Sequence, residues 1–159
     1  MLAGIGVLAY TQTKISAKPT LNTEDIMDTN IDWKHIKKSE WKDRLDDAEF
    51  YVLRKEGTER SFSSALNAEK RAGTFVCAGC ALPLFTSETK FESGTGWPSF
   101  HTPITNNVET KRDFKLVLPR TEYHCARCGG HQGHVFKDGP KPSGLRYCNN
   151  GVALDFVPT

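Results

Sequence analysis

The sequence predicts a mainly β protein whose strands pair antiparallel. After Gly57 the chain consists of short apolar runs separated by Gly, Pro and Asn, a texture typical of short strands and tight turns. No long helical pattern lies between these runs, which argues against a parallel sheet built with crossover helices. Two C-x-x-C pairs in the same region indicate a metal site. A length of 159 residues suits one ordinary domain.

The N-terminal region is expected to lie outside this domain. The first ten residues, "MLAGIGVLAY", are apolar but too short to span a bilayer, and they lack the basic flank and cleavage site of a complete signal peptide. Residues 11–29 are polar and show no apolar periodicity. We therefore expect a flexible tail or export-signal remnant at 1–30 and a folded domain at 31–159. The expected location is cytoplasmic, with export or membrane tethering through the apolar N-terminus as the alternative.

A helical segment is expected at the start of the domain, in "SEWKDRLDDAEFYVLRKEG". The spacing predicts one helix, or two short helices with a break near residues 46–47. Ser39 is the expected N-cap, and Gly57 the expected stop. The apolar side chains that recur along one face, at i, i+4, i+7 and i+11, are those of Trp41, Leu45, Ala48 and Val52.

Strands are expected in four apolar runs. These are "TFV" before the first cysteine pair, "FKLVL" from Phe114, "TEYHC" from Thr121 and "VALDFV" from Val152. The last run has a period of two, which predicts one better-buried face. The residues expected on that face are Val152, Leu154 and Phe156.

The paired cysteines predict a structural zinc site. Two C-x-x-C turns can direct four sulfurs to one tetrahedral centre, and four sulfur ligands leave no open position for a catalytic water. Gly129 and Gly130 follow the second pair and suit a tight metal-binding turn. Free or disulfide-bonded cysteines are the simpler alternative. A thioredoxin-like dithiol is set aside because Pro83 and no helical period follow the first pair. The four expected ligands are Cys77, Cys80, Cys125 and Cys128.

The fifth cysteine, Cys148, stands apart from the two pairs. If "LRYCNN" is extended, Arg146 and Asn150 lie on the same face as Cys148, so that a cation and an amide flank its sulfur. His131 and His134, upstream in "GGHQGHVF", could donate a proton or orient a substrate. Spacing alone leaves Cys148 equally a nucleophile or a small buried core residue, and leaves each histidine a capping or surface residue.

The charge balance excludes some partners. The chain carries 21 basic and 19 acidic side chains, a formal net charge of +2, scattered along its length. No basic stretch is large enough to indicate nucleic acid or an anionic membrane as a partner. Small molecules or proteins are the expected substrates.

Several ordered motifs together resemble a known family. The stretches "SGTGWPSF" and "HQGHVFKDGPKPSGLRYCNNGVALDFV" and the two C-x-x-C pairs are similar to those of the B-type peptide methionine-R-sulfoxide reductases. The resemblance runs from about Trp41 to Pro158. It implies two antiparallel sheets (a β-tent) with short N-terminal helices and one structural zinc ion. It also implies that Cys148 reduces peptide-bound methionine-R-sulfoxide and becomes a sulfenic acid. The implied partners are oxidised proteins or peptides and thioredoxin or another thiol reductant, and we expect a monomer.

The resemblance also assigns roles to the residues around Cys148. His131 and His134 supply or position the acid that protonates the sulfoxide oxygen. Arg146 and Asn150 support the thiolate. A protonated oxygen is needed because an unprotonated sulfoxide oxygen leaves poorly.

An aromatic wall for the substrate methyl group is implied at Trp97 together with Phe136. Without the resemblance, Trp97 is more simply a core tryptophan in a Pro-containing turn. Two positions depart from the family pattern. Thr95 stands where many members have a second, resolving cysteine, and Gly151 stands where serine is frequent. The first change leaves the regeneration route open, and the second is expected to alter only a turn.

Two other functions remain as alternatives. One is a zinc-stabilised β adaptor that binds a protein partner without turnover, but such a protein would not need the residues gathered around Cys148. The other is a cysteine hydrolase that uses Cys148 with a histidine, but no orienting acid or oxyanion motif is evident.

Overall fold

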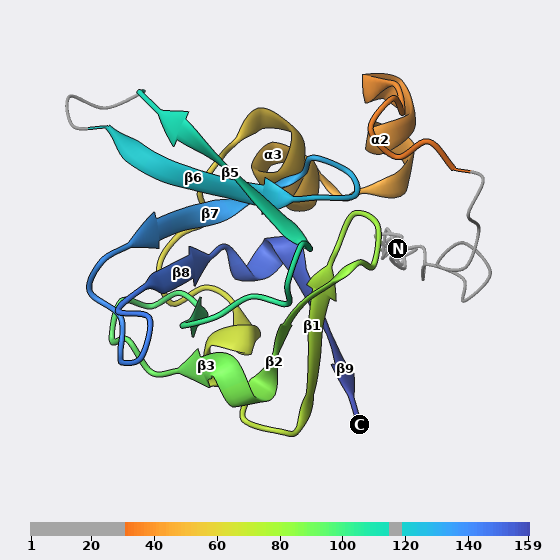
Figure 1. The fold of residues 1–159 in the computed structure, drawn as a ribbon. Coiled ribbons are helices and arrows are strands. Elements are labelled where there is room, and N and C mark those ends of the chain that lie inside the picture. Colours follow the sequence, from red (N-terminus) through yellow and green to blue (C-terminus); the bar gives the residue numbers. More distant parts are fainter. Residues whose placement is uncertain (1–30, 115–118) are drawn as a thin grey trace, which may run out of the picture.

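The computed structural model describes residues 31–114 and 119–159 (Figure 1). The N-terminal tail or export-signal remnant expected at residues 1–30 lies outside this part. In the part that is described, no helix is long and apolar enough to cross a membrane. The predicted class is confirmed, because the described chain is mainly β with two antiparallel sheets and short N-terminal helices.

Two short helices, α2 (Lys38–Arg44) and α3 (Asp47–Lys55), open the domain. The predicted break between two helices is confirmed. Asp46 begins α3 with a capping box, in which its Oδ1 accepts the Glu49 N–H at 2.8 Å and Glu49 Oε2 accepts the Asp46 N–H at 3.0 Å. The reciprocal bonds stop α2 from continuing as one helix.

The expected helix ends need correction. Ser39 lies inside α2 and is not its N-cap, because the Trp41 N–H already bonds to the Lys37 carbonyl at 3.1 Å and closes the first turn there. Gly57 does follow the end of α3, but Glu56 takes the left-handed conformation, with φ of 54°. A Cβ at Gly57 would lie 2.2 Å from the ring of Tyr51, so a larger residue there would displace that exposed side chain.

The strands form two sheets in which every pair is antiparallel (Figure 1). The smaller sheet has the order β2-β1-β9, and the larger has the order β3-β4-β8-β7-β6-β5. The bounds are β1 Gly73–Cys77, β2 Pro83–Thr86, β3 Lys90–Phe91, β4 Ser99–Phe100, β5 Val108–Asp113, β6 Arg120–Cys125, β7 His131–Phe136, β8 Arg146–Asn149 and β9 Leu154–Pro158. Short 3-10 helices lie at η1 Ala65–Ala68, η2 Ser87–Thr89 and η3 Gly151–Ala153.

The predicted strands are largely confirmed. "TFV" lies in β1 and "TEYHC" lies in β6. The run "FKLVL" is different, because Phe114 follows the end of β5 and residues 115–118 lie outside the described part. The strand that pairs with β6 is the upstream segment "VETKRD", which the apolar pattern missed. It is an edge strand with mostly exposed, charged side chains, and such strands lack an apolar signature.

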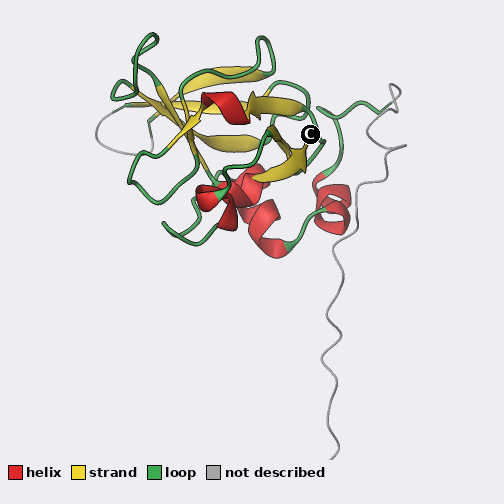
Figure 2. Cartoon of the chain, turned by 90° about the horizontal axis from the view of Figure 1, so that it is seen from below, coloured by secondary structure: helices red, strands yellow, loops and turns green. Residues whose placement is uncertain are grey.

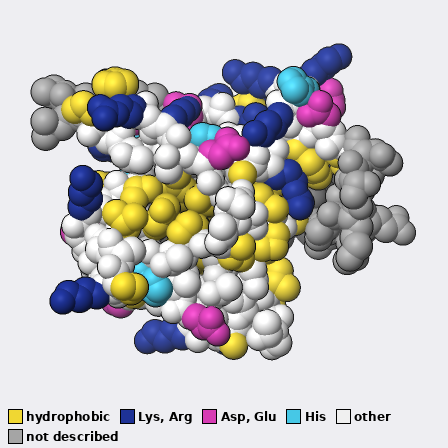
Figure 3. All heavy atoms as spheres, viewed as in Figure 1, with side chains coloured by type: hydrophobic (Ala, Val, Ile, Leu, Met, Phe, Trp, Pro, Cys, Tyr) yellow, Lys and Arg dark blue, Asp and Glu magenta, His cyan; other side chains and the backbone are white. Residues whose placement is uncertain are grey.

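Aromatic side chains from both sheets form the core. Phe75 of β1 meets Phe100 of β4 with ring centroids 5.0 Å apart, and Phe85 of β2 stacks on Phe100 at 4.1 Å. Tyr123 of β6 meets Phe85 edge-on at 6.1 Å. These contacts join the two sheets face to face. Figure 2 shows most helical segments gathered on one side of the strands, and on the face shown in Figure 3 hydrophobic side chains occupy the middle with charged side chains around them.

The alternation predicted for the last strand holds only from Leu154 onward. Leu154 is buried and Phe156 is half-buried, while Val157 is exposed. Val152 and Ala153 depart from the prediction because they belong to η3, where Ala153 is fully buried and Val152 only partly. Gly151 begins this turn, and a Cβ on it would lie 2.1 Å from Ser64 Oγ. Glycine at residue 151, where the resemblance implies a frequent serine, thus leaves room for Ser64.

We expect Gly151→Ala to destabilise the protein and Ser64→Gly to relieve part of that loss. The added methyl group overlaps Ser64, and overpacking of this kind costs about 1–3 kcal/mol. The free energy of unfolding should be measured by denaturant titration for both single variants and the double variant. Effects that simply add would show that Ser64 is not the group that excludes a side chain at residue 151.

Candidate active site and metal centre

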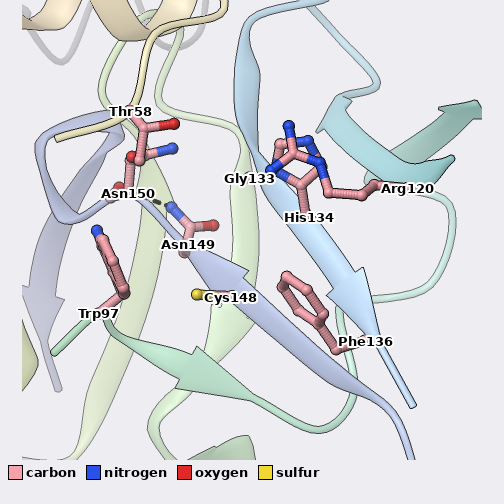
Figure 4. A pocket seen from close by; sticks show the side chains of 9 residues that line it. All are labelled: Thr58, Trp97, Arg120, Gly133, His134, Phe136, Cys148, Asn149 and Asn150. Atoms are coloured by element: carbon pink, nitrogen blue, oxygen red, sulfur yellow. Dashed lines mark hydrogen bonds between the residues drawn. The ribbon is translucent and has the colours of Figure 1, made fainter. Parts of the chain in front are cut away.

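Cys148 lies in the interior of the larger sheet, on β8. Its neighbour on β7 is His134, and its neighbour on β4 is Ser99. Side chains of directly paired residues lie on the same face, so His134 and Cys148 both face the pocket. A pocket of about 130 Å³ opens here, smaller than the roughly 300–1,000 Å³ of pockets for drug-sized ligands. Its lining residues are Thr58, Trp97, Arg120, Gly133, His134, Phe136, Cys148, Asn149 and Asn150 (Figure 4).

The environment of Cys148 acts on its pKa in two directions. Burial raises the pKa of the thiol, whereas the positive charge of Arg146 and hydrogen bonding from Thr95 and Arg146 lower it. Burial prevails, and the pKa is raised above its ordinary value. The cationic support expected from Arg146 is therefore present but outweighed. Near neutral pH Cys148 is a protonated thiol that must lose its proton to act as a nucleophile.

His134 belongs to a buried charge network that the sequence did not reveal. Its Nε2 lies 2.9 Å from Asp113 Oδ2, and the same oxygen accepts a hydrogen bond from Arg120 at 2.8 Å. The ionised carboxylate therefore assigns the hydrogen to Nε2 and leaves a lone pair on Nδ1. Burial lowers the pKa of His134 more than Asp113 raises it. Neutral His134 beside a protonated thiol is an arrangement suited to proton exchange.

His131 reaches the same side of β7 as His134 through a β-bulge. Residues three apart in a regular strand point to opposite faces, but the register shifts between Tyr123 and His124 and leaves Gln132 as the extra residue. The two imidazole rings consequently lie 5.5 Å apart. His131 is buried, with Nδ1 2.9 Å from Glu122 Oε1, and it does not line the pocket. Its place suits support of His134 rather than contact with a substrate.

Arg146 also lies outside the pocket lining. Its guanidinium makes two parallel hydrogen bonds of 2.9 Å to the Asp138 carboxylate and lies 4.5 Å from the centroid of the Phe136 ring. Bidentate pairing of this kind fixes the guanidinium plane. Arg146 thus holds Phe136 in place as one side of the pocket while its charge acts on Cys148.

Asn150 and Trp97 form the opposite side of the pocket. In Figure 4 the sulfur of Cys148 lies between the rings of Trp97 and Phe136. Strand β8 ends at Asn149, so the period-two argument does not extend to Asn150. Both polar atoms of the Asn150 amide bond to backbone, since Oδ1 accepts the Glu59 N–H at 3.0 Å and Nδ2 donates to the Gln132 carbonyl at 2.9 Å. The amide therefore holds the turn after Cys148.

Hydroxyl groups cluster around residue 95, the position at which the resemblance implies a resolving cysteine in many members. Thr95 Oγ1 lies 2.8 Å from Ser93 Oγ, which in turn lies 2.8 Å from Ser99 Oγ. Ser99 is paired with Cys148 across the sheet. A second sulfur at residue 95 would enter a polar cluster adjacent to Cys148.

The paired cysteines form a separate cluster. The four buried sulfurs all lie within 4.8 Å of one another. The distances are 3.7 Å between Cys77 and Cys128 and 3.5 Å between Cys80 and Cys125. A tetrahedral zinc ion with Zn–S bonds of about 2.3 Å holds its sulfurs about 3.8 Å apart, so the donor set fits one zinc ion. The predicted structural metal site is confirmed.

The two metal turns differ at one position. Gly129 has φ of 68°, as expected for a tight turn after the second pair, whereas Ala81 takes φ of 55° after the first. Both turns are closed by backbone bonds to the first cysteine, Gly129 N–H to Cys125 O at 2.9 Å and Ala81 N–H to Cys77 O at 2.7 Å. The left-handed alanine shows that the metal turn can impose a conformation that alanine otherwise disfavours.

Several pocket residues were missed by sequence reasoning. Thr58 and Arg120 line the pocket and Asp113 contacts His134. All three come from segments far from Cys148 in the sequence, and no local pattern could connect them. Gly133 did carry a signal, because glycine inside a strand often marks a close backbone approach. A Cβ at Gly133 would lie 1.9 Å from the Cys148 carbonyl oxygen, so β7 and β8 could not pair normally beside the thiol.

Fold and site together define a metal-stabilised antiparallel β protein with one thiol, Cys148, placed in a pocket for redox chemistry or nucleophilic attack. Comparison with known proteins identifies the family. The model of the SelR domain matches residues 45–158. The chain therefore belongs to the SelR-domain family.

Individual relatives agree with this assignment. "Peptide methionine sulfoxide reductase MsrB" of Pseudomonas putida (strain W619) is 55% identical over 121 residues, which are 75% of this chain and 90% of that protein. "Peptide methionine sulfoxide reductase B1, chloroplastic" of Arabidopsis thaliana is 42% identical over 151 residues, covering 94% of this chain and 74% of that protein. Among solved structures, the Mis18 "Yippee-like" domain has a TM-score of 0.44 and 18% identity over 56% of this chain and 98% of that chain.

Replacing Cys125 or Cys128 with serine should release the metal and destabilise the fold. Zinc binding to structural sites contributes about 10–16 kcal/mol in small peptides, so its loss removes a large share of stability. Metal content by atomic emission should fall from one zinc ion per chain, together with the thermal midpoint. Cys148→Ser is the control and should keep its zinc. A serine variant that stays folded and active without metal would contradict a structural role.

Proposed function

We propose that this protein reduces peptide-bound methionine-R-sulfoxide to methionine with Cys148 as the nucleophile, and so repairs oxidised proteins. The observation that carries the proposal is the position of the Cys148 thiol, between two aromatic rings and beside a neutral histidine, in a chain of the SelR-domain family. The relatives named above are peptide methionine sulfoxide reductases. None of the observations favours the adaptor without turnover that the sequence left as an alternative.

The chemistry follows from the protonation states of Cys148 and His134. The thiol transfers its proton to Nδ1 of His134, and the resulting thiolate attacks the sulfoxide sulfur. This attack forms an S–S bond between Cys148 and the substrate, and His134 returns the proton to the sulfoxide oxygen. The hydroxyl group then moves to the Cys148 sulfur as both the S–S bond and the S–O bond to the substrate sulfur break. The products are methionine and a Cys148 sulfenic acid, so the substrate gains two electrons and the cysteine loses two.

The remaining predicted residues have supporting roles in this proposal. Trp97 and Phe136 form apolar walls for the substrate methyl group, since sulfur–aromatic contact is favourable. His131 supports His134, Arg146 holds Phe136 and lowers the thiol pKa, and Asn150 holds the turn after β8. Asp113 orients His134.

The sulfenic acid is returned to the thiol by an external reductant. Two reductant thiols supply two electrons and two protons, which gives a disulfide and water. Thioredoxin is the proposed reductant. The four zinc ligands leave no further cysteine in the sequence for an internal disulfide, because Thr95 occupies the resolving position.

The domain bounds, the oligomeric state and the location of the protein are also part of the proposal. Residues 31–159 form the reductase domain, which acts as a monomer in the cytoplasm without binding nucleic acid. The nearly balanced charge of 21 basic and 19 acidic side chains supports the exclusion of nucleic acid.

Cys148→Ser should abolish reduction of a methionine-R-sulfoxide peptide, because serine cannot serve as the soft nucleophile. Turnover should be measured by chromatography with each sulfoxide epimer and with dithiothreitol or thioredoxin as the reductant. The unmodified protein should act on the R epimer alone. Zinc content and cooperative unfolding of the variant are the controls for folding. Retained turnover with serine, or equal activity on both epimers, would overturn the proposal.

Oxidation with one equivalent of substrate and no reductant should leave Cys148 as a sulfenic acid, which dimedone traps for mass spectrometry. Thr95→Cys should convert this product to a disulfide with Cys148, because residue 95 adjoins the sulfur. Thr110→Cys, on edge strand β5, is the control and should still yield the sulfenic acid. A disulfide between Cys148 and a zinc ligand in the unmodified protein would contradict the one-cysteine route.

A further inference from the structure

Glu59 is hydrogen-bonded to several residues at or next to the pocket. It is half-buried and lies in the segment between α3 and η1, outside both sheets. Its carboxylate accepts the Gly151 N–H at 2.6 Å through Oε1 and the Val152 N–H at 2.9 Å through Oε2. Hydrogen bonds to an ionised carboxylate are stronger than those between neutral groups. Glu59 thus anchors the turn that directly follows Asn150.

The backbone of Glu59 bonds to both side chains on one side of the pocket. Its N–H donates to Asn150 Oδ1 at 3.0 Å, and its carbonyl accepts the Trp97 Nε1–H at 3.2 Å. Thr58, the preceding residue, lines the pocket itself. One residue therefore links the segment at 58–59, the turn at 150–152 and the indole of Trp97.

These links extend beyond the strand ladders, because the last backbone bond between the Trp97 and Asn150 segments runs from the Asn149 N–H to the Pro98 carbonyl at 2.9 Å and the segment at 58–59 belongs to no strand. Strand β8 ends at Asn149, and β4 begins at Ser99, so Asn150 and Trp97 each lie beyond a strand end. Their positions relative to Cys148 depend on the bonds that they make outside the ladders. The Glu59 carboxylate fixes the backbone of Glu59 against the turn at 150–152. The carbonyl of that backbone in turn accepts the hydrogen bond from the Trp97 indole.

We infer that Glu59 is a positioning residue that sets the distance between the Trp97 wall and Cys148, an inference that rests on the proposed reductase function. Its side chain acts through the turn at 150–152 and does not contact the reacting atoms. Loss of the carboxylate should therefore weaken substrate binding more than it slows the chemical step.

The test compares Glu59→Ala and Glu59→Gln with Glu69→Gln. Glu69 is a matched control, because its carboxylate also accepts a backbone N–H, that of Arg71 at 2.9 Å, but Arg71 does not line the pocket. Glu59→Ala should lower kcat/KM on a methionine-R-sulfoxide peptide about tenfold, mostly through KM, which is the size expected when bonds to one charged group are lost. Glu59→Gln keeps one acceptor oxygen and should recover part of the loss. Glu69→Gln should match the unmodified protein.

A double-mutant cycle with Trp97→Phe separates positioning from general destabilisation. Phenylalanine keeps an aromatic wall but cannot donate to the Glu59 carbonyl. If Glu59 acts through Trp97, the effect of Glu59→Ala on kcat/KM should be clearly smaller in the Trp97→Phe background. Equal fold-changes in the two backgrounds, or a Glu59→Ala variant as active as Glu69→Gln, would overturn the inference.

A measurement without turnover distinguishes this inference from the proposed function. The fluorescence of Trp97 is obtained by subtracting the spectrum of the matching Trp97→Phe variant from that of each protein. Acrylamide should quench this Trp97 fluorescence more strongly in Glu59→Ala than in the unmodified protein. If the unmodified protein reduces neither epimer, the proposed function fails, while increased quenching still supports positioning of Trp97 by Glu59. Unchanged quenching in an active protein contradicts the positioning alone.

Discussion

The convergence of four sulfurs on one centre is the constraint on which the rest of the structure depends. Cys77 ends β1 in the smaller sheet, and Cys125 ends β6 in the larger one, so the metal turns tie the two sheets together at one end. Helix α3 packs on the second of these turns, since a Cβ on Gly130 would lie 3.0 Å from Leu53 and Arg54 donates to the Cys128 carbonyl at 2.9 Å. One metal site therefore organises both sheets and α3.

The same constraint extends into the pocket through β7. This strand begins three residues after Cys128, so the second metal turn sets where the strand starts. Gln132, the extra residue of the bulge, donates through its side chain to Cys77 Sγ at 3.3 Å, and its carbonyl accepts two bonds from Asn150. Strand β7 thus carries three features: Gln132 contacts a metal ligand, Gly133 lets β8 approach, and His134 is paired with Cys148.

Burial governs the electrostatics of the pocket more than individual charges do. It raises the pKa of Cys148 despite Arg146 and lowers the pKa of His134 despite Asp113, so both groups are neutral near pH 7. A protonated thiol is a weak nucleophile, and a neutral imidazole can accept its proton. The pair is suited to hold the reactive thiolate back until a substrate occupies the pocket. In the proposed reaction the buried Asp113 carboxylate stabilises the imidazolium that forms.

Local patterns were enough to predict the zinc turns, the two helices and three of the nine strands of the described part, β1, β6 and β9, because spacing within a few residues determines them. The paired cysteines and Gly129 are examples. The same spacing left Cys148 either a nucleophile or a core residue, and it extended the face of β8 to Asn150, one residue beyond the strand. Only tertiary structure decided that Asp113 meets His134, that a bulge brings His131 to the same face, and that Glu59 bonds to Trp97. These contacts join residues from separate strands and loops, and no short-range period records such pairing.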